Sequence, residues 1–127
     1  MSDQQDIQTV FDGIYQAWAD GDADSFAKLY TDDATVVMRG VFNQGRDKIR
    51  AYMAAGFAGP LAGSKGVDTP QDIRVIDGHT AIVVSEAGII PAGQDQVPAN
   101  HTVRATWVLS KRDGRWLIAA YSNTPLG

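Results

Sequence analysis

The chain has 127 residues, of which 44% are hydrophobic and 20% charged, with a net charge of -4 and no cysteine. These values are typical of one globular domain over 1–127, and they exclude a disordered chain, a disulfide framework and a thiolate metal site. The negative charge and the lack of a long basic cluster argue against nucleic acid and membrane as partners. No run predicts a membrane-spanning helix and the acidic start is unlike a secretory signal, so we expect a cytoplasmic protein.

The first periodic segment is helical. Apolar residues recur every three or four positions over 3–20, which predicts an amphipathic helix there. Gly21 favours its end, and a short second helix is expected over 25–30. The acidic pair Asp32 and Asp33 closes that helix, and we expect it to make capping and turn hydrogen bonds without a catalytic role.

The rest of the chain reads as a strand, a helix and then a sheet. β-Branched residues predict a strand at 34–39, and apolar spacing predicts a third helix at 45–57. After a glycine-rich loop, four strand-like runs follow, at 72–77, 80–90, 101–110 and 115–123. This order predicts an α+β fold in which three N-terminal helices cover one face of a curved antiparallel sheet. Such a cone leaves a hollow that side chains or a ligand must fill.

Several segments resemble a known family. The segments AWADGDADSFAKLYTDDATV (17–36) and GRDKIRAY (45–52) resemble the nuclear transport factor two-like superfamily, in its SnoaL-like and ketosteroid-isomerase-like branch. Within that branch, FAGPLAGSKG (57–66) and RDGRWLIAAYSNTP (112–125) are most similar to the SgcJ/EcaC family of small proteins, some of which are encoded in enediyne antibiotic clusters. The resemblance implies a cone-shaped, cystatin-like fold with an apolar pocket, often as a homodimer that packs through the outer face of the sheet.

The resemblance also tests the best-known chemistry of the superfamily. In ketosteroid isomerases one aspartate is the base, and a tyrosine and a protonated aspartic acid form the oxyanion hole. Aligned on the motifs above, these positions fall on Met38, Ile14 and about Ala105. None of these side chains can transfer or donate a proton, so that mechanism is excluded. The last two predicted strands also lack the carboxylate that polyketide cyclases of the branch use there.

Strand alternation indicates which titratable side chains could enter the hollow. If Val84 faces inward, so does Glu86, and a carboxylate in an apolar cavity has a raised pKa that suits a general acid or base. The alternatives for Glu86 are an ion pair with a cation such as Arg74 or Arg104, or an outward position. His101 titrates near neutral pH at a strand end where a pocket mouth would be, unless it is a solvated histidine.

The other inward positions predict an apolar lining with a few polar points. Tyr121 and Asn123 could bind a substrate carbonyl or hydroxyl, or could hydrogen-bond each other. The expected ligand contacts, several of which could equally be core, are Ile14, Trp18, Met38, Met53, Phe57, Val84, Trp107, Tyr121 and Asn123. Outward alternation assigns to a dimer face the residues Trp116, Val83, Ile89, Val108 and Ile118.

Two functions stay open at this point. No phosphate-binding glycine loop precedes a helix, and two distant histidines make a poor metal site, so we expect no cofactor and no metal. One hypothesis is a cofactor-free acid/base isomerase, cyclase or lyase that acts on a hydrophobic polyketide or enediyne-type intermediate, with Glu86 and His101 as catalytic residues. The other is a non-catalytic accessory module that binds a hydrophobic small molecule.

Overall fold

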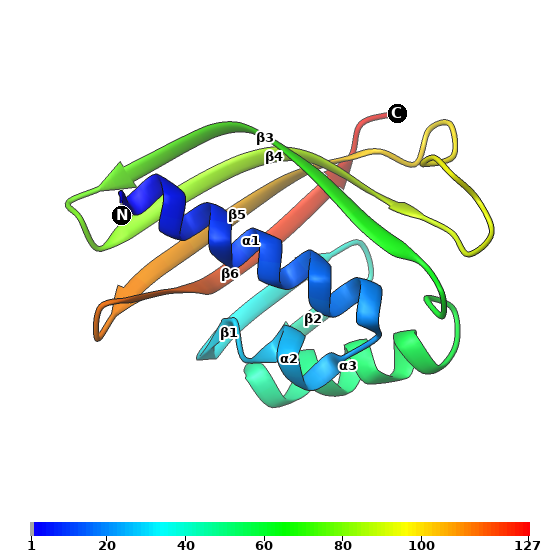
Figure 1. Ribbon diagram of the computed structural model, residues 1–127, viewed down its shortest axis with the longest axis horizontal. Coiled ribbons are helices and arrows are strands. Elements are labelled where there is room, and N and C mark those ends of the chain that lie inside the picture. Colours follow the sequence, from blue (N-terminus) through cyan, green and yellow to red (C-terminus); the bar gives the residue numbers. More distant parts are fainter. Residues whose placement is uncertain (1) are drawn as a thin grey trace.

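The computed structural model describes residues 2–127, which form three helices and one six-stranded sheet (Figure 1). The helices are α1 (Asp3–Asp20), α2 (Ala23–Ala27) and α3 (Arg46–Ala58). The strands are β1 (Tyr30–Met38), β2 (Val41–Gln44), β3 (Lys65–Ile76), β4 (Thr80–Ile90), β5 (Val103–Arg112) and β6 (Arg115–Pro125). The predicted α+β class is therefore confirmed.

The break between α1 and α2 is built by local hydrogen bonds. Ser2 and Gln5 form a capping box at the start of α1, since each side chain accepts a backbone N–H from the other residue. Gly21 ends α1 with a φ of 65°, in the left-handed region that glycine adopts without strain. Asp22 then caps α2 by accepting the N–H of Ser25 at 3.1 Å. The chain is thereby turned from α1 towards the sheet.

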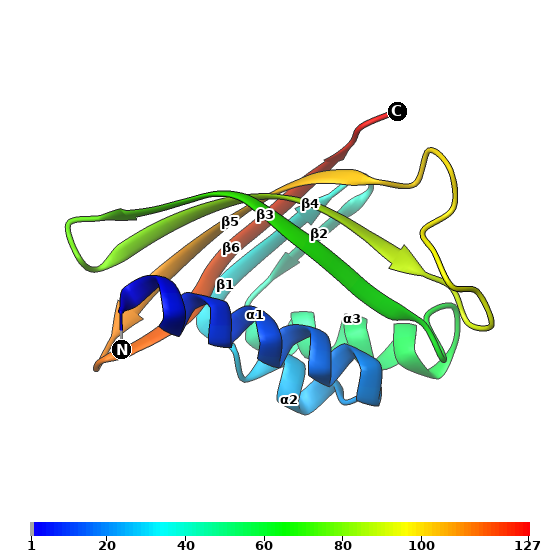
Figure 2. The same cartoon turned by 45° about the horizontal axis from the view of Figure 1, so that its top comes forward.

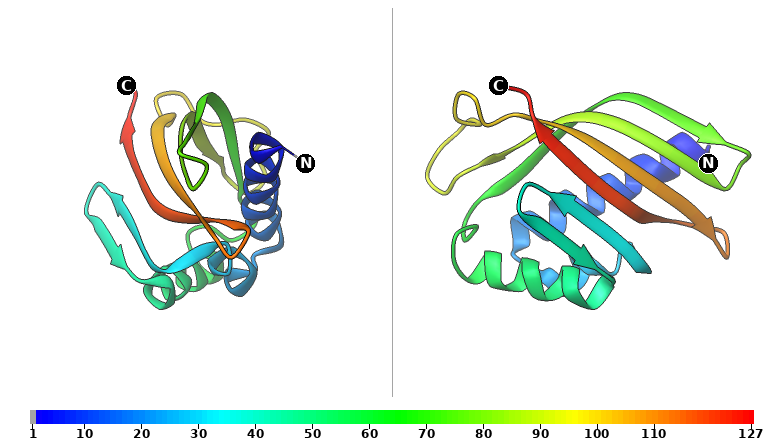
Figure 3. Two further views of the ribbon diagram at one scale, coloured as in Figure 1. Left: turned by 90° about the vertical axis from the view of Figure 1, so that its left-hand side faces the viewer. Right: turned by 180° about the vertical axis from the view of Figure 1, so that it is seen from behind.

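The sheet has the order β2-β1-β6-β5-β4-β3, in which β1 and β6 are parallel and all other neighbours antiparallel. It is strongly curved, and α1 lies across its concave face while α2 and α3 lie together beneath β1 (Figures 2 and 3). The helices and the concave face enclose the interior. The opposite face of the sheet carries no helix, as the view from behind shows (Figure 3).

Some predicted boundaries were wrong. The second helix ends at Ala27, before the predicted 25–30 segment is complete, because Tyr30 already begins β1. Asp32 and Asp33 consequently lie in β1, where both are near Arg112, instead of closing a helix. The short strand β2 was not predicted, and the loop expected before the sheet contains the start of β3.

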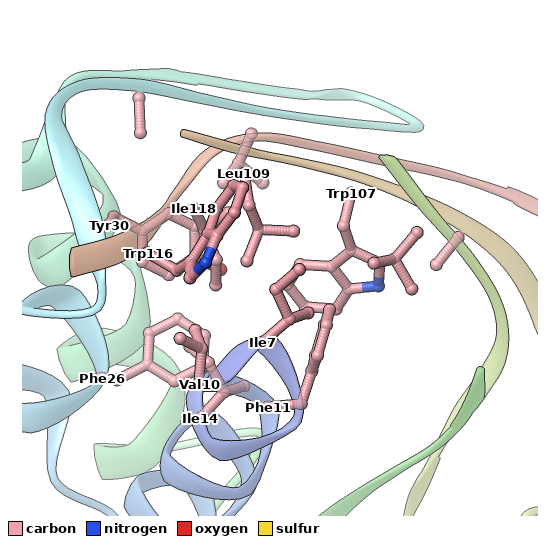
Figure 4. Close-up of a cluster of buried hydrophobic side chains, with 14 of the residues drawn as sticks. Ile7, Val10, Phe11, Ile14, Phe26, Tyr30, Trp107, Leu109, Trp116 and Ile118 are labelled. Carbon is pink, nitrogen blue, oxygen red and sulfur yellow. The ribbon is translucent and has the colours of Figure 1, made fainter. Parts of the chain in front are cut away.

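Side chains fill one half of the interior. The core there joins α1 to the middle of the sheet (Figure 4). Phe11 meets the ring of Trp107 edge to face, with 4.8 Å between the ring centroids. Other buried members of this cluster are Ile7, Val10, Leu109, Trp116 and Ile118. Burial of such side chains is the main favourable term in folding.

A β-bulge in β6 explains why Trp116 and Ile118 are buried rather than exposed on a dimer face. Leu109 pairs with Ile118, but the neighbouring Val108 pairs with Ala120, so Ala119 is an extra residue. The extra residue inverts the alternation. Inward positions therefore include Trp116 and Ile118 before the bulge as well as Tyr121 and Asn123 after it.

The predicted orientation of β4 was wrong by one residue. Ser85 is completely buried, whereas Glu86 is exposed and lies opposite Arg104 on the outer face. Val84 is turned outward for the same reason, and Val83, assigned to the dimer face, is buried in the core. The segment TAIVVSEAGII is apolar at both odd and even positions, so its pattern alone does not say which face is inside.

Candidate functional site

A pocket of about 680 Å³ occupies the other half of the interior, between α1, α3 and the sheet. This volume lies within the range of known small-molecule sites, roughly 300–1,000 Å³. The wall brings together eight of the predicted residues, namely Ile14, Trp18, Met38, Met53, His101, Trp107, Tyr121 and Asn123. Their roles in binding stay predictions, but their convergence on one cavity is a property of the fold.

Trp18 is held in this wall by both ends of its indole. Its Nε1–H donates to Ser64 Oγ at 2.9 Å, and Ser64 Oγ in turn donates to the carbonyl of Leu61. The ring packs edge-on against Phe26 and Phe57. Phe57 was predicted to contact the ligand, but it lies behind Trp18 and is not part of the lining. Its contribution is to fix the orientation of the indole.

The lining contains no Asp, Glu, Lys or Arg among residues 2–127. Glu86, predicted as the catalytic acid, is outside on the convex face of the sheet, and Val84 is not in the lining either. An uncompensated charge in an apolar cavity is strongly unfavourable. The pocket therefore suits a neutral ligand.

Tyr121 and Asn123 form a polar pair within the wall. Asn123 Nδ2 donates to Tyr121 Oη at 2.7 Å, as one of the two sequence-based alternatives predicted. The Tyr121 ring also packs on Trp107, with 4.3 Å between centroids. Burial raises the pKa of Tyr121, so its phenol keeps its proton over the physiological pH range.

His101 lies at the wall but is exposed to solvent. Its Nδ1 is 2.8 Å from the carbonyl oxygen of Ala99, and its backbone N–H donates to Pro98, so the loop before β5 fixes its position. It is thus a rim residue with one ring nitrogen engaged by the backbone.

Sequence reasoning missed a half-buried carboxylate, Asp68 of β3, behind Tyr15. Asp68 Oδ2 accepts hydrogen bonds from Tyr15 Oη at 3.0 Å and from Ser85 Oγ at 2.7 Å. Ser85 Oγ also accepts the indole N–H of Trp107 at 3.2 Å. Burial raises the pKa of Asp68, although the hydrogen bonds from Ser85 and Tyr15 oppose the shift. If the predicted strand had begun at Lys65, as β3 does, its alternation would have placed Gly66 and Asp68 on the inner face.

Asp68 does not line the large pocket. It faces a smaller cavity of about 330 Å³ on the far side of Tyr15, between α1 and β3. A Cβ at Gly66 would lie 2.7 Å from the Tyr15 ring, so only glycine lets that ring lie against β3. The rings of Tyr15 and Trp107 thus line the pocket. The O–H of Tyr15 points to Asp68, and the N–H of Trp107 points to Ser85.

The sequence was compared with models of protein families, and one family model matches most of the chain. The model of the SnoaL-like domain matches residues 1–122. The chain belongs to the SnoaL-like domain family. SnoaL-like domains are typically small-molecule-binding domains, in keeping with a cavity between helices and sheet. The more specific resemblance to the SgcJ/EcaC family stays a prediction. No curated protein matches the chain.

Solved structures share the fold of this SnoaL-like domain. A domain of unknown function with a cystatin-like fold from Nostoc punctiforme is 23% identical with a TM-score of 0.87, covering 96% of this chain and 76% of that one. An NTF2-like protein from Novosphingobium aromaticivorans, also cystatin-like, is 17% identical with a TM-score of 0.84, covering 98% and 82%. At such identities the likeness shows the fold alone. No helix within residues 2–127 is long and apolar enough to cross a membrane.

Proposed function

We propose that this SnoaL-like domain binds a neutral, largely apolar small molecule in the 680 Å³ pocket. The observation that carries the proposal is a cavity of ligand size whose lining, within the described residues, has no charged carboxylate, ammonium or guanidinium group. The resemblance in sequence suggests a polyketide or enediyne-type intermediate as the class of ligand. An uncharged ring system of that kind would bury its surface against Trp18, Trp107 and Met53.

Binding is favoured over acid/base catalysis by the position of the titratable groups. Among residues 2–127 the lining has one imidazole, that of His101, and it is exposed at the rim. The half-buried carboxylate of Asp68 is behind Tyr15 and faces another cavity. We therefore prefer the non-catalytic alternative to a cofactor-free isomerase, cyclase or lyase.

The proposal is tested by filling the pocket from β4. Ala87 lines the pocket and is buried, so Ala87→Phe places a ring inside it. Val84→Phe adds the same ring to the outer face of the same strand and is the matched control. Binding of a panel of neutral aromatic polyketides, followed by tryptophan fluorescence, should be lost in Ala87→Phe and kept in Val84→Phe. Equal binding by both variants would contradict the proposal.

We also propose that the outer face of the sheet pairs with a second copy of the chain. From β2 to β4 one cross-strand row of that face is uncharged and ends at Asp72 of β3; its members are Phe42, Val37, Ser122, Thr106 and Val84. Phe42 and Val37 are 65% and 46% exposed, which is unusual for side chains of this size. On a chain of net charge -4, this uncharged row is where two copies repel each other least.

A further inference from the structure

One cross-strand row crosses the inner face of the sheet beside the pocket. Asn43 of β2 pairs with Val36 of β1, and Val36 pairs with Tyr121 of β6. All three line the pocket, so they share its face. Since neighbouring strands are about 4.8 Å apart, the backbones of Asn43 and Tyr121 are about 10 Å apart, with only the methyl groups of Val36 between them.

Asn43 carries an unused donor. Its Nδ2 is buried and has no hydrogen-bond partner among residues 2–127. Most buried polar side-chain atoms in native proteins are paired, because a buried donor without an acceptor is costly. Because Asn43 is a lining residue of the pocket, a ligand bound there is the available source of the missing acceptor.

Tyr121 supplies a second donor on the other side of Val36. Its oxygen already accepts from Asn123 Nδ2 at 2.7 Å, which fixes its position. A phenol that accepts one hydrogen bond still has its own O–H to donate, and no acceptor for it is found in the described part of the chain. The ring is also fixed by its packing on Trp107.

We infer that Asn43 Nδ2 and Tyr121 Oη each offer a hydrogen bond to an acceptor oxygen, of the carbonyl class, on an otherwise apolar neutral ligand. The oxygen of such a ligand lies at the β2 and β6 side of the pocket, and its apolar part extends towards Trp18 and Met53. Both donors are uncharged, so they suit a ketone, ester or lactone; a carboxylate would find no cation in the lining. This inference rests on the proposed function and narrows its ligand class.

The test compares two rigid probes that differ in one group, 9-fluorenone with a ketone and fluorene with a methylene. The wild-type protein should bind fluorenone about tenfold more tightly than fluorene, as expected for a net hydrogen bond. Asn43→Leu and Tyr121→Phe should each lower the ratio of the fluorenone affinity to the fluorene affinity, measured within the same variant. Gln44→Leu, on the same strand but exposed, is the matched control and should behave as wild type.

Infrared spectroscopy gives a second readout that does not depend on how well a variant folds. The C=O stretch of fluorenone bound to the wild type should lie at a lower wavenumber than in an aprotic solvent, because hydrogen bonds weaken that bond. Equal affinity for both probes with an unshifted stretch overturns this inference but leaves the proposed function standing. Failure of both probes to bind overturns the proposed function and the inference together.

Discussion

Replacing Ser85 by alanine should lower the free energy of unfolding by more than the loss of one hydroxyl group suggests. Ser85 is fully buried and joins two groups, since it donates to Asp68 Oδ2 and accepts from Trp107 Nε1. Alanine leaves the indole N–H without an acceptor and removes one of the two hydrogen bonds to Asp68 Oδ2. A buried unsatisfied donor costs roughly 1–3 kcal/mol, and a hydrogen bond to a charged group contributes roughly 1.5–3 kcal/mol.

Because part of this loss is relieved by relaxation and by the remaining bond from Tyr15, we expect Ser85→Ala to lower the free energy of unfolding by about 3 kcal/mol. For a domain of this length that corresponds to a fall in Tm of roughly 10–15 °C. Chemical denaturation and calorimetry measure both quantities, with Ser122→Ala, an exposed serine on β6, as the control. A loss below about 1 kcal/mol would refute the view that Ser85 joins Asp68 to Trp107.

Three further predictions follow from single residues. Burial raises the pKa of Asp68 in the folded state above its usual 3.8. The protonated carboxyl therefore contributes to the free energy of unfolding below pH 3.8, and this contribution is lost as the pH rises through the raised pKa. In urea titrations, the stability of Asp68→Asn relative to wild type should increase between pH 4 and 7. Gly21→Ala should cost about 1 kcal/mol by thermal unfolding, because φ is 65° and nothing lies near the added Cβ. Val108→Asp, on the outer face, should convert the proposed dimer to a monomer in sedimentation velocity, and an unchanged dimer would contradict the proposed interface.

Much of the fold could be predicted because local signals agree with the tertiary structure. The helical period of 3–20 and the left-handed glycine at its end fix α1, and the observed Asp3–Asp20 has the predicted bounds. The Asp-Gly turn at 113–114 joins β5 to β6, and its two residues have positive φ. By contrast, β2 has only four residues between Gly40 and Gly45, which is too short for a period to be recognised.

The site was less predictable, because it depends on which face of each strand is inside. In β4 both faces are apolar, so Glu86 was placed inside although it is exposed. In β6 the bulge at Ala119 reverses the alternation, which no single-strand pattern can show. Asp68 was missed because the edge strand β3 contains Pro70, a residue that weakens any strand assignment.

The two sides of the pocket differ in whether their polar atoms are already paired. On the side of α1 and β5, Tyr15 and Trp107 donate to Asp68 and Ser85, so they offer the ligand only aromatic carbon. On the side of β2 and β6, the donors of Asn43 and Tyr121 have no acceptor within the described residues 2–127. The binding free energy is most favourable when the apolar part of the ligand contacts the rings of Tyr15 and Trp107 and its oxygen contacts the donors of Asn43 and Tyr121. Each side of the pocket then exchanges water for a matching partner. In the proposed binding mode Asp68 and Ser85 act without touching the ligand, because they accept the hydrogen bonds of Tyr15 and Trp107, which would otherwise compete for the ligand oxygen.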